Sequence, residues 1–141
     1  FLSGGGGLLS TIQDYMRFTQ LLHSGGILDG VRLLSPHTLQ MMRMNHLPNN
    51  ETLMQRASGS FSEVSYGGTG FGLGFSVVTD PSQTATVSFQ GNYSWGGMAS
   101  TFFWNDPIND ITTIFMTQLM PSGTYPVRPQ LSQLVYASLM E

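Results

Sequence analysis

The sequence contains neither lysine nor cysteine among its 141 residues. Without lysine it has no Walker A phosphate loop, no Schiff-base amine and no Ser-x-x-Lys pair in which lysine activates a serine nucleophile. Without cysteine it has no disulfide, no thiolate nucleophile and no sulfur ligand for a metal. These two absences exclude several common covalent and phosphate-binding mechanisms for the chain by itself.

Charge is also scarce in this sequence. Charged residues make up 9% of the chain, against roughly a quarter in typical soluble domains. Hydrophobic residues make up 40%, and nine residues are methionine. One interpretation is a weakly charged soluble protein. The other, which we favour, is that a missing partner segment covers much of this surface.

Several binding functions find no support in the residues. A net charge of −3 with five basic residues argues against nucleic-acid binding, which depends on clustered lysine and arginine. No run approaches the roughly 18 apolar residues of a membrane span. His23, His37 and His46 lack a spacing that would gather them around a metal. The glycine clusters match no dinucleotide fingerprint, and we expect neither a metal nor a cofactor.

The length of 141 residues fits one domain with a single hydrophobic core. The chain starts with Phe1 rather than methionine, and residues 1–9 have neither the basic start nor the long apolar run of a secretion signal. We therefore expect this chain to be cut from a longer one. The sequence indicates no cellular compartment.

The first part of the chain predicts two helices around a short hairpin. Apolar residues at helical intervals predict a helix over about 11–23, with Ser10 three residues before Gln13 at capping-box spacing. Asp29-Gly30 then stands between two short apolar runs, which is typical of a two-residue hairpin turn.

The second helix starts at Ser35-Pro36, with serine as N-cap and proline at the first helical position. We expect it to run to about Asn45. Residues 47–69 are polar and show no steady period, so they predict a long surface loop or a lid.

Strand patterns dominate the rest of the chain. Large apolar residues alternate with glycine or serine over 71–77, which predicts a strand with one nearly bare face that something must approach closely. Two further strands are predicted at 97–104 and 111–118, paired antiparallel through the turn at 106–110. Their apolar residues lie on both faces, as in central strands.

Residues 86–90 are a further strand candidate, and a helix closes the chain. The helix carries a stripe of mostly apolar residues suited to lying on the sheet. That stripe consists of Leu131, Leu134, Val135, Ser138 and Leu139. The predicted fold class is α+β, with N-terminal helices, an antiparallel sheet and a covering C-terminal helix.

One motif, Trp95-Gly96-Gly97-Met98, resists a purely structural explanation. Paired glycines weaken a central strand unless something must approach the backbone closely, and they allow a bound molecule to take hydrogen bonds from the main chain. The alternative is a bulge where Trp95 fills the core. From this motif alone the two interpretations stay open.

The order of several motifs resembles the second half of β-lactamase-related serine hydrolases, which are similar to class C β-lactamases and penicillin-binding proteins, and especially their esterase-like branch. The matching blocks span nearly the whole chain, and their order is more specific than any one block. They are Gly7 to Thr11 with Asp14, Tyr15 and Phe18, then Gly26 to Pro36, Gly70 to Phe75, Trp95 to Gly97, and Phe103 to Pro107.

This resemblance implies that residues 1–141 are a C-terminal fragment, with a helical part at about 8–46, a loop at about 47–69, and a sheet with its terminal helix at about 70–141. It implies an active site between this half and an upstream helical half. Trp95-Gly96-Gly97 looks like the third family motif, and the backbone N–H of Met98 would be one of two donors to the oxyanion. Trp95, Gly96, Gly97 and Tyr93 would border the substrate.

The resemblance also implies that the nucleophilic serine and its lysine lie upstream, because Ser-x-x-Lys is absent and no counterpart of the catalytic tyrosine is evident. The chain alone should then be inactive. Many family members carry lysine where this chain has Trp95, and the missing cation favours neutral acyl esters over β-lactams or peptidoglycan peptides. A β-lactamase or peptidase proper, a non-catalytic binding member of the same fold and a free-standing β-rich interaction module remain as alternatives.

Overall fold

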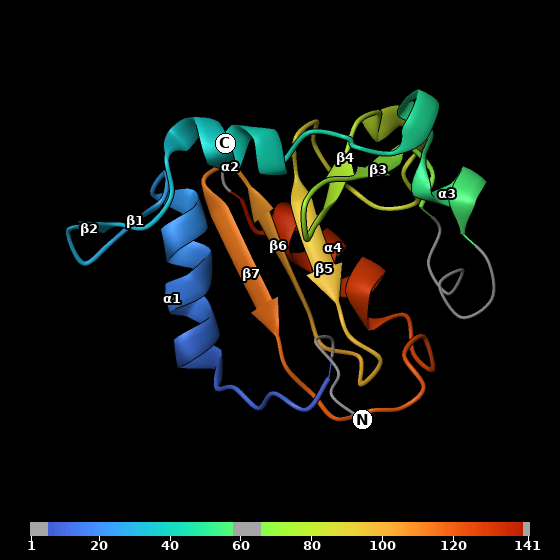
Figure 1. The fold of residues 1–141 in the computed structure, drawn as a ribbon. Coiled ribbons are helices and arrows are strands. Elements are labelled where there is room, and N and C mark those ends of the chain that lie inside the picture. Colours follow the sequence, from blue (N-terminus) through green and yellow to red (C-terminus); the bar gives the residue numbers. More distant parts are fainter. Residues whose placement is uncertain (1–5, 58–65, 140–141) are drawn as a thin grey trace.

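The computed structural model describes residues 6–57 and 66–139, and Figure 1 shows the order of their helices and strands. The helices are α1 (Ile12–His23), α2 (Pro36–Met42), α3 (Leu53–Arg56) and α4 (Val127–Ala137), with short 3-10 turns η1 (Pro48–Asn50) and η3 (Pro81–Gln83). The strands are β1 (Ile27–Leu28), β2 (Val31–Arg32), β3 (Thr69–Phe71), β4 (Ser76–Val78), β5 (Tyr93–Gly96), β6 (Phe102–Asp106) and β7 (Ile111–Phe115).

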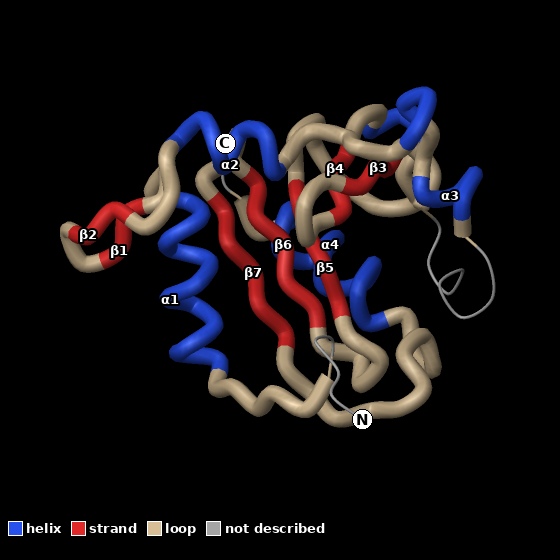
Figure 2. Tube along the Cα trace, viewed as in Figure 1, coloured by secondary structure: helices blue, strands red, loops and turns tan. Residues whose placement is uncertain are grey.

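The centre of the molecule is a five-stranded antiparallel sheet in the order β3-β4-β5-β6-β7. Figure 2 shows these strands side by side, with α1 beside β7 and α4 behind the sheet. Helices therefore cover both faces, and the predicted α+β class is confirmed. None of the helices in the described ranges is long and apolar enough to cross a membrane.

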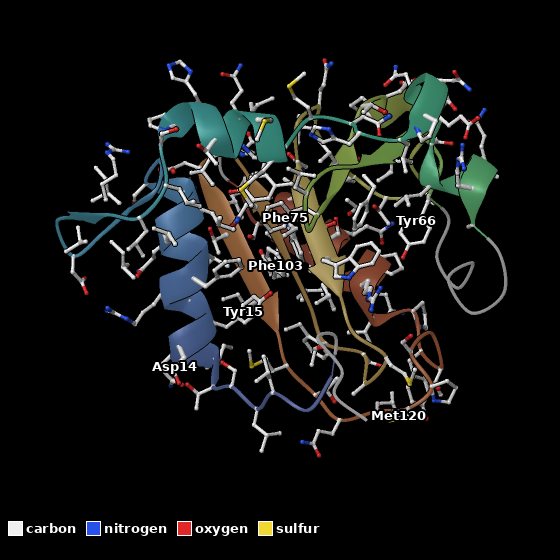
Figure 3. The ribbon with its side chains drawn as sticks, viewed as in Figure 1. Asp14, Tyr15, Tyr66, Phe75, Phe103 and Met120 are labelled. Atoms are coloured by element: carbon white, nitrogen blue, oxygen red, sulfur yellow. The ribbon has the colours of Figure 1, made fainter. Side chains whose placement is uncertain are left out.

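The two faces of the sheet follow from the alternation of side chains along β6. Phe103 faces α1, where its ring lies 5.2 Å from the ring of Tyr15, and it packs with Phe75 in the main core cluster (Figure 3). Phe102 and Trp104 face the opposite side, where their rings stack at 5.9 Å. Every residue of β6 is buried, as expected for a strand with a neighbour on each side and helices on both faces.

The local predictions for the first part of the chain are confirmed with one change. Helix α1 has the expected extent, but its N-cap is Thr11, whose side chain accepts from the amide of Asp14. Both turn residues of the β1–β2 hairpin have positive φ, 50° at Asp29 and 78° at Gly30. Ser35 caps α2 as predicted.

Beyond α2 two predictions were wrong in detail. Helix α2 ends at Met42 rather than near Asn45. The segment predicted as a long loop at 47–69 contains η1 and α3. Thr52 and Gln55 form a capping box at the start of α3, a signal within the polar run that the weak periodicity obscured. Residues 58–65 of the same prediction lie outside the described part.

The single strand predicted over 71–77 is instead a hairpin of β3 and β4. Gly74 has a φ of 98° and forms part of its turn. The close approach predicted for the bare face is confirmed at Gly72 but not at Gly74, where a Cβ would meet no atom within 4 Å. A Cβ on Gly72 would lie 2.0 Å from the carbonyl oxygen of Met42, and one on Gly70 would lie 2.3 Å from the Asn45 side chain.

Three further strand and helix predictions need correction. The strand predicted at 97–104 starts only at Phe102, because 97–101 form a turn. Residues 86–90 form no strand. The stripe predicted for α4 is only partly right, since Leu134 is 68% exposed and Leu139 45% exposed.

Candidate active site

The motif singled out in the sequence lies where β5 ends and turns into β6. Trp95 and Gly96 close β5, opposite Phe103 and Phe102. Gly97 and Met98 begin the turn that leads to β6. Met98 therefore occupies a hairpin turn rather than a strand, because the chain must reverse here for β5 and β6 to pair antiparallel.

Hydrogen bonds fasten this turn on several sides. The Gly97 N–H donates to the Thr101 oxygen at 2.8 Å, and the Ser100 N–H donates to the Gly97 oxygen at 3.1 Å. The segment after β7 adds two bonds, from the Leu119 amide to the Ala99 oxygen at 3.1 Å and from the Ser100 hydroxyl to the Leu119 oxygen at 2.7 Å. The carbonyls of the turn are thus largely occupied within the protein.

The Met98 N–H makes no hydrogen bond to any part of the chain that the structure describes. The residue Met98 is 70% exposed. Free amides are common at the central positions of turns, and the Ala99 N–H is also unbonded within 6–57 and 66–139. In this turn the neighbouring groups are fixed by hydrogen bonds, so the free donors have a defined direction.

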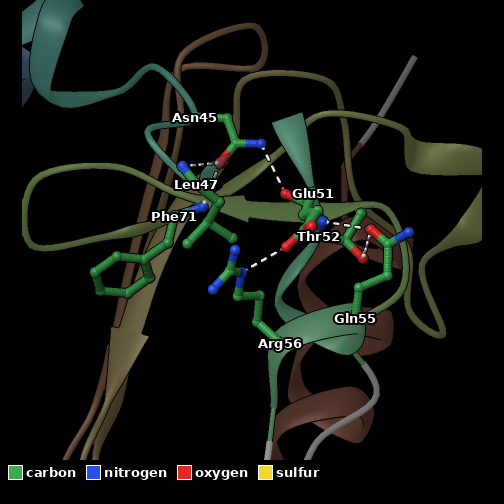
Figure 4. A network of polar contacts seen from close by, with 7 residues as sticks. All are labelled: Asn45, Leu47, Glu51, Thr52, Gln55, Arg56 and Phe71. Carbon is green, nitrogen blue, oxygen red and sulfur yellow. Dashed lines mark hydrogen bonds and ion pairs between the residues drawn. The ribbon is translucent and has the colours of Figure 1, made fainter. Parts of the chain in front are cut away.

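The Trp95 side chain, near the end of β5, packs against another aromatic ring. Its ring meets the ring of Phe71 edge to face, with centroids 4.8 Å apart. The Phe71 backbone is held by Asn45, whose side-chain oxygen accepts from the amides of Phe71 at 3.0 Å and Leu47 at 3.1 Å (Figure 4). The Asn45 amide group also donates to the Glu51 carbonyl at 2.9 Å. Asn45 therefore fixes the backbone of Phe71, the residue against which Trp95 packs.

Tyr93 does not lie at this surface. It is 1% exposed, packs against Phe75 at 5.3 Å between ring centroids, and lies under the guanidinium of Arg43 at 5.2 Å. Burial raises the pKa of the Tyr93 hydroxyl, although Arg43 and a hydrogen bond with Asn105 oppose the rise. Tyr93 is a core residue, and we leave it out of the proposed site.

On the α4 face, a buried carboxylate closes the β6–β7 turn. Asp106 accepts from the amides of Ile108 at 2.9 Å and Asn109 at 3.1 Å, from the Asn109 side chain at 2.7 Å and from the Tyr136 hydroxyl at 2.8 Å. Burial raises the pKa of Asp106, but these hydrogen bonds outweigh it and hold the pKa below its ordinary value. Burial and the bond to Asp106 raise the pKa of Tyr136.

Sequence reasoning missed two residues that contact the site. The sequence predicts for Asn45 only the end of a helix, and it predicts no site role for Arg128. One signal for Arg128 was available, because it is the only charged residue between Asp110 and Glu141. Among the described residues no three His, Asp or Glu side chains converge where a metal ion could bind.

Comparison with known proteins decides the family. A family model described as Beta-lactamase matches residues 2–137. This chain belongs to the beta-lactamase family. The resemblance found in the ordered motifs is confirmed by this match.

The sequence relatives and the solved structures agree with that assignment. The chain is 36% identical over 124 residues to Protein Rv1367c of Mycobacterium tuberculosis strain H37Rv, with 86% of this chain and 30% of the relative covered. The chain thus spans about a third of the length of the curated relatives it matches.

Among solved structures, EstCE1, a hydrolase with promiscuous acyltransferase activity, has a TM-score of 0.67 and 26% identity over 88% of this chain and 29% of its own. Simvastatin synthase (LovD) from Aspergillus terreus has a TM-score of 0.65 and 25% identity over 87% of this chain and 33% of its own. The fold is therefore that of beta-lactamase-family hydrolases.

Proposed function

We propose that this chain is part of a longer serine hydrolase and supplies one of the two amide donors that hold the oxyanion. An upstream serine attacks the carbonyl carbon of an acyl ester, and an upstream lysine relays the serine proton to the departing alcohol. Water then attacks the acyl-enzyme and releases the acid. During both steps the Met98 N–H binds the carbonyl oxygen as negative charge develops.

The observation that carries this proposal is the free Met98 amide within a fixed turn. An oxyanion donor must be unbonded before the reaction and must already point at the position where charge appears. Met98 has an exposed side chain and an N–H without a partner in the described chain. Its neighbour Gly97, by contrast, has both its amide and its carbonyl engaged.

A missing upstream half is supported by the uncovered apolar surface. A cavity of about 540 Å³ lies between the sheet and α4, with Phe102, Trp104 and Phe115 in its lining. This space opens to solvent, and apolar rings that line an open space usually mark an interaction surface, which supports a covering segment. Tyr125, which also lines this space, is 63% exposed. A segment covering this face also explains the low charge content of 9%.

The expected substrate class follows from Trp95. Its indole offers one N–H donor, a large apolar face and no charge, so it provides nothing to neutralise the carboxylate of a β-lactam or a peptide. An acyl group without charge would pack on this surface. The description of EstCE1 as a hydrolase with promiscuous acyltransferase activity agrees with acyl transfer.

The proposal is tested with the full-length protein that contains this chain and its natural upstream sequence. We expect it to hydrolyse short p-nitrophenyl esters, and we expect the separate 1–141 chain to be inactive. Absence of turnover by the full-length protein, or equal turnover by the separate chain, contradicts the proposal.

A non-catalytic binding protein of the same fold is the main competing function. A serine-reactive fluorophosphonate separates the two, because it labels only an activated serine. We expect label on an upstream serine that is followed three residues later by lysine. An unlabelled protein that still binds esters without turnover supports the competing function.

A further inference from the structure

Arg128 reaches the candidate site from the back of the sheet. It lies near the start of α4, and its Nη2 is 3.4 Å from both the Gly97 oxygen and the Thr101 oxygen. Its guanidinium carbon lies 5.5 Å from the centre of the Phe102 ring. A planar cation packed on an aromatic face keeps its orientation, so Arg128 bridges the two carbonyls that flank the turn.

Gly96 gives an independent sign of this contact. A Cβ at this position would lie 2.5 Å from Arg128 Nη2, 2.8 Å from its Cζ and 2.9 Å from the Thr101 oxygen. Gly96 does not have the positive φ that usually requires glycine. The absent side chain therefore provides the space that the guanidinium occupies.

The contact matters because of the geometry of one peptide group. The Gly97 carbonyl and the Met98 N–H belong to the same planar peptide, and only Met120-Pro121 is cis in the described chain. In a trans peptide the C=O and N–H point in opposite directions. The Gly97 oxygen also accepts from the Ser100 N–H. With two donors on this oxygen, the peptide plane is fixed and the Met98 N–H is directed away from α4.

We propose that Arg128 is a positioning residue for the oxyanion donor: by binding the Gly97 and Thr101 carbonyls it sets the direction of the Met98 N–H. This inference rests on the proposed function and adds a residue to it. The positive charge on the carbonyl side of the peptide also polarises the N–H, because hydrogen bonds in a chain strengthen one another. Arg128 touches no substrate in this arrangement.

The test uses three variants of the full-length protein and p-nitrophenyl butyrate. Arg128→Gln should lower kcat by about 10- to 100-fold, as expected for a misplaced catalytic group, with KM changed by less than about twofold. Arg128→Lys should recover part of this loss, since one ammonium can reach a carbonyl but cannot stay flat on Phe102.

Arg32→Gln is the matched control. Arg32 also bridges two backbone carbonyls, those of Gly25 and Leu34 at 3.0 Å each, but in the β1–β2 hairpin. We expect its kcat to equal that of the wild type. If Arg128→Gln leaves kcat unchanged, or if Arg32→Gln lowers it equally, the positioning role is overturned.

Amide hydrogen exchange provides a readout that does not depend on activity. In Arg128→Gln the Gly97 and Ser100 amides, which are bonded within the turn, should exchange at least about tenfold faster than in the wild type, while those of the β1–β2 hairpin stay unchanged. If the wild type turns over no ester, the proposed function fails but this comparison still decides the role of Arg128. Unchanged exchange in the turn overturns it. If Arg128→Gln does not fold, Arg128→Lys is measured in the same way.

Discussion

In each of two hairpins of this molecule, an arginine side chain binds two backbone carbonyl groups. The two arginines differ in how far along the chain they lie from the carbonyls that they bind. In the β1–β2 hairpin, Arg32 binds carbonyls two and seven residues away along the chain. In the β5–β6 hairpin, Arg128 binds carbonyls 27 and 31 residues away and comes from another element. The first hairpin is held from within its own segment and by an ion pair of Asp29 with Arg17 of the adjacent helix α1, whereas the second is held by α4 across the sheet.

A functional turn is positioned precisely only when contacts fix it relative to the rest of the domain. The β1–β2 hairpin is tied to the adjacent helix α1, through the Gly26 amide on the Leu21 oxygen and the Arg17–Asp29 ion pair, and its strand β2 is exposed. A hairpin tied to a helix across the sheet is fixed relative to the whole domain. An amide that must meet a group from another part of the protein needs the second arrangement.

The β6–β7 turn is held both by a local side chain and by a side chain from α4. Asp106 binds the Ile108 and Asn109 amides locally and receives a hydrogen bond from Tyr136 of α4.

Asp106→Asn replaces a charged acceptor and should lower the free energy of unfolding by about 2 to 3 kcal/mol. Asp110→Asn, in an exposed ion pair with His23, should cost less than about 1 kcal/mol. Denaturant unfolding of the two full-length variants checks this.

The same carboxylate predicts an acid dependence of stability. The pKa of Asp106 is lowered in the folded state, so its contribution is complete above the unfolded aspartate pKa of about 3.9 and is lost as pH falls through the lower folded pKa. The stability difference between wild type and Asp106→Asn should be constant from neutral pH to about pH 5 and shrink below about pH 4. A difference that grows on acidification contradicts this assignment.

The next largest loss of stability is expected at Gly96, whose missing side chain leaves space for the Arg128 guanidinium. Gly96→Ala places a Cβ 2.5 Å from Arg128 Nη2 and 2.9 Å from the Thr101 oxygen, and it should cost about 2 kcal/mol, as overpacking does. Gly30→Ala meets no atom within 4 Å and has only its φ of 78° to overcome, at about 1 kcal/mol. Only Gly96→Ala should also lower kcat. If both variants lose kcat equally, the proposal that the β5–β6 hairpin affects catalysis more than the β1–β2 hairpin is contradicted.

The smallest effect belongs to the local arginine. Arg32→Gln removes two hydrogen bonds from a hairpin whose strand β2 is exposed, and water can replace them. We expect a loss of about 0.5 to 1 kcal/mol in the free energy of unfolding, measured by denaturant titration. A loss above that expected for Gly96→Ala indicates that β1–β2 carries more of the fold than its exposure suggests.

Turns held by nearby residues could be predicted from the sequence, and turns held by distant residues could not. Helix α1, the Asp29-Gly30 turn and the Ser35-Pro36 helix start were predictable because their determinants lie within a few residues. The β5–β6 turn falls within the strand predicted over 97–104, and the positive φ of 67° lies at Ser100, where no sequence signal marks it.

The supports of the site were less accessible to prediction. Asn45 contacts Phe71 across 26 residues, and Arg128 contacts Gly97 across 31. The residues next to Asn45 and Arg128 in the sequence give no indication of these distant partners. The motif Trp95 to Met98 could be identified because paired glycines are costly in a strand, but its orientation required the fold.

The Met98 peptide offers the most direct test of the central claim, which is that its N–H is the oxyanion donor. Met98 is the second residue of a turn closed by the Ser100 amide and the Gly97 oxygen, a position where proline is favoured. Met98→Pro therefore removes the N–H while keeping the turn, and Met98→Ala keeps the N–H while removing the exposed side chain.

With p-nitrophenyl butyrate and full-length proteins of matched melting temperature, we expect kcat to fall by about 10²- to 10³-fold in Met98→Pro. In Met98→Ala it should stay within about twofold of the wild type, because the side chain makes no contribution to the donor. A folded Met98→Pro variant that retains wild-type kcat contradicts the account.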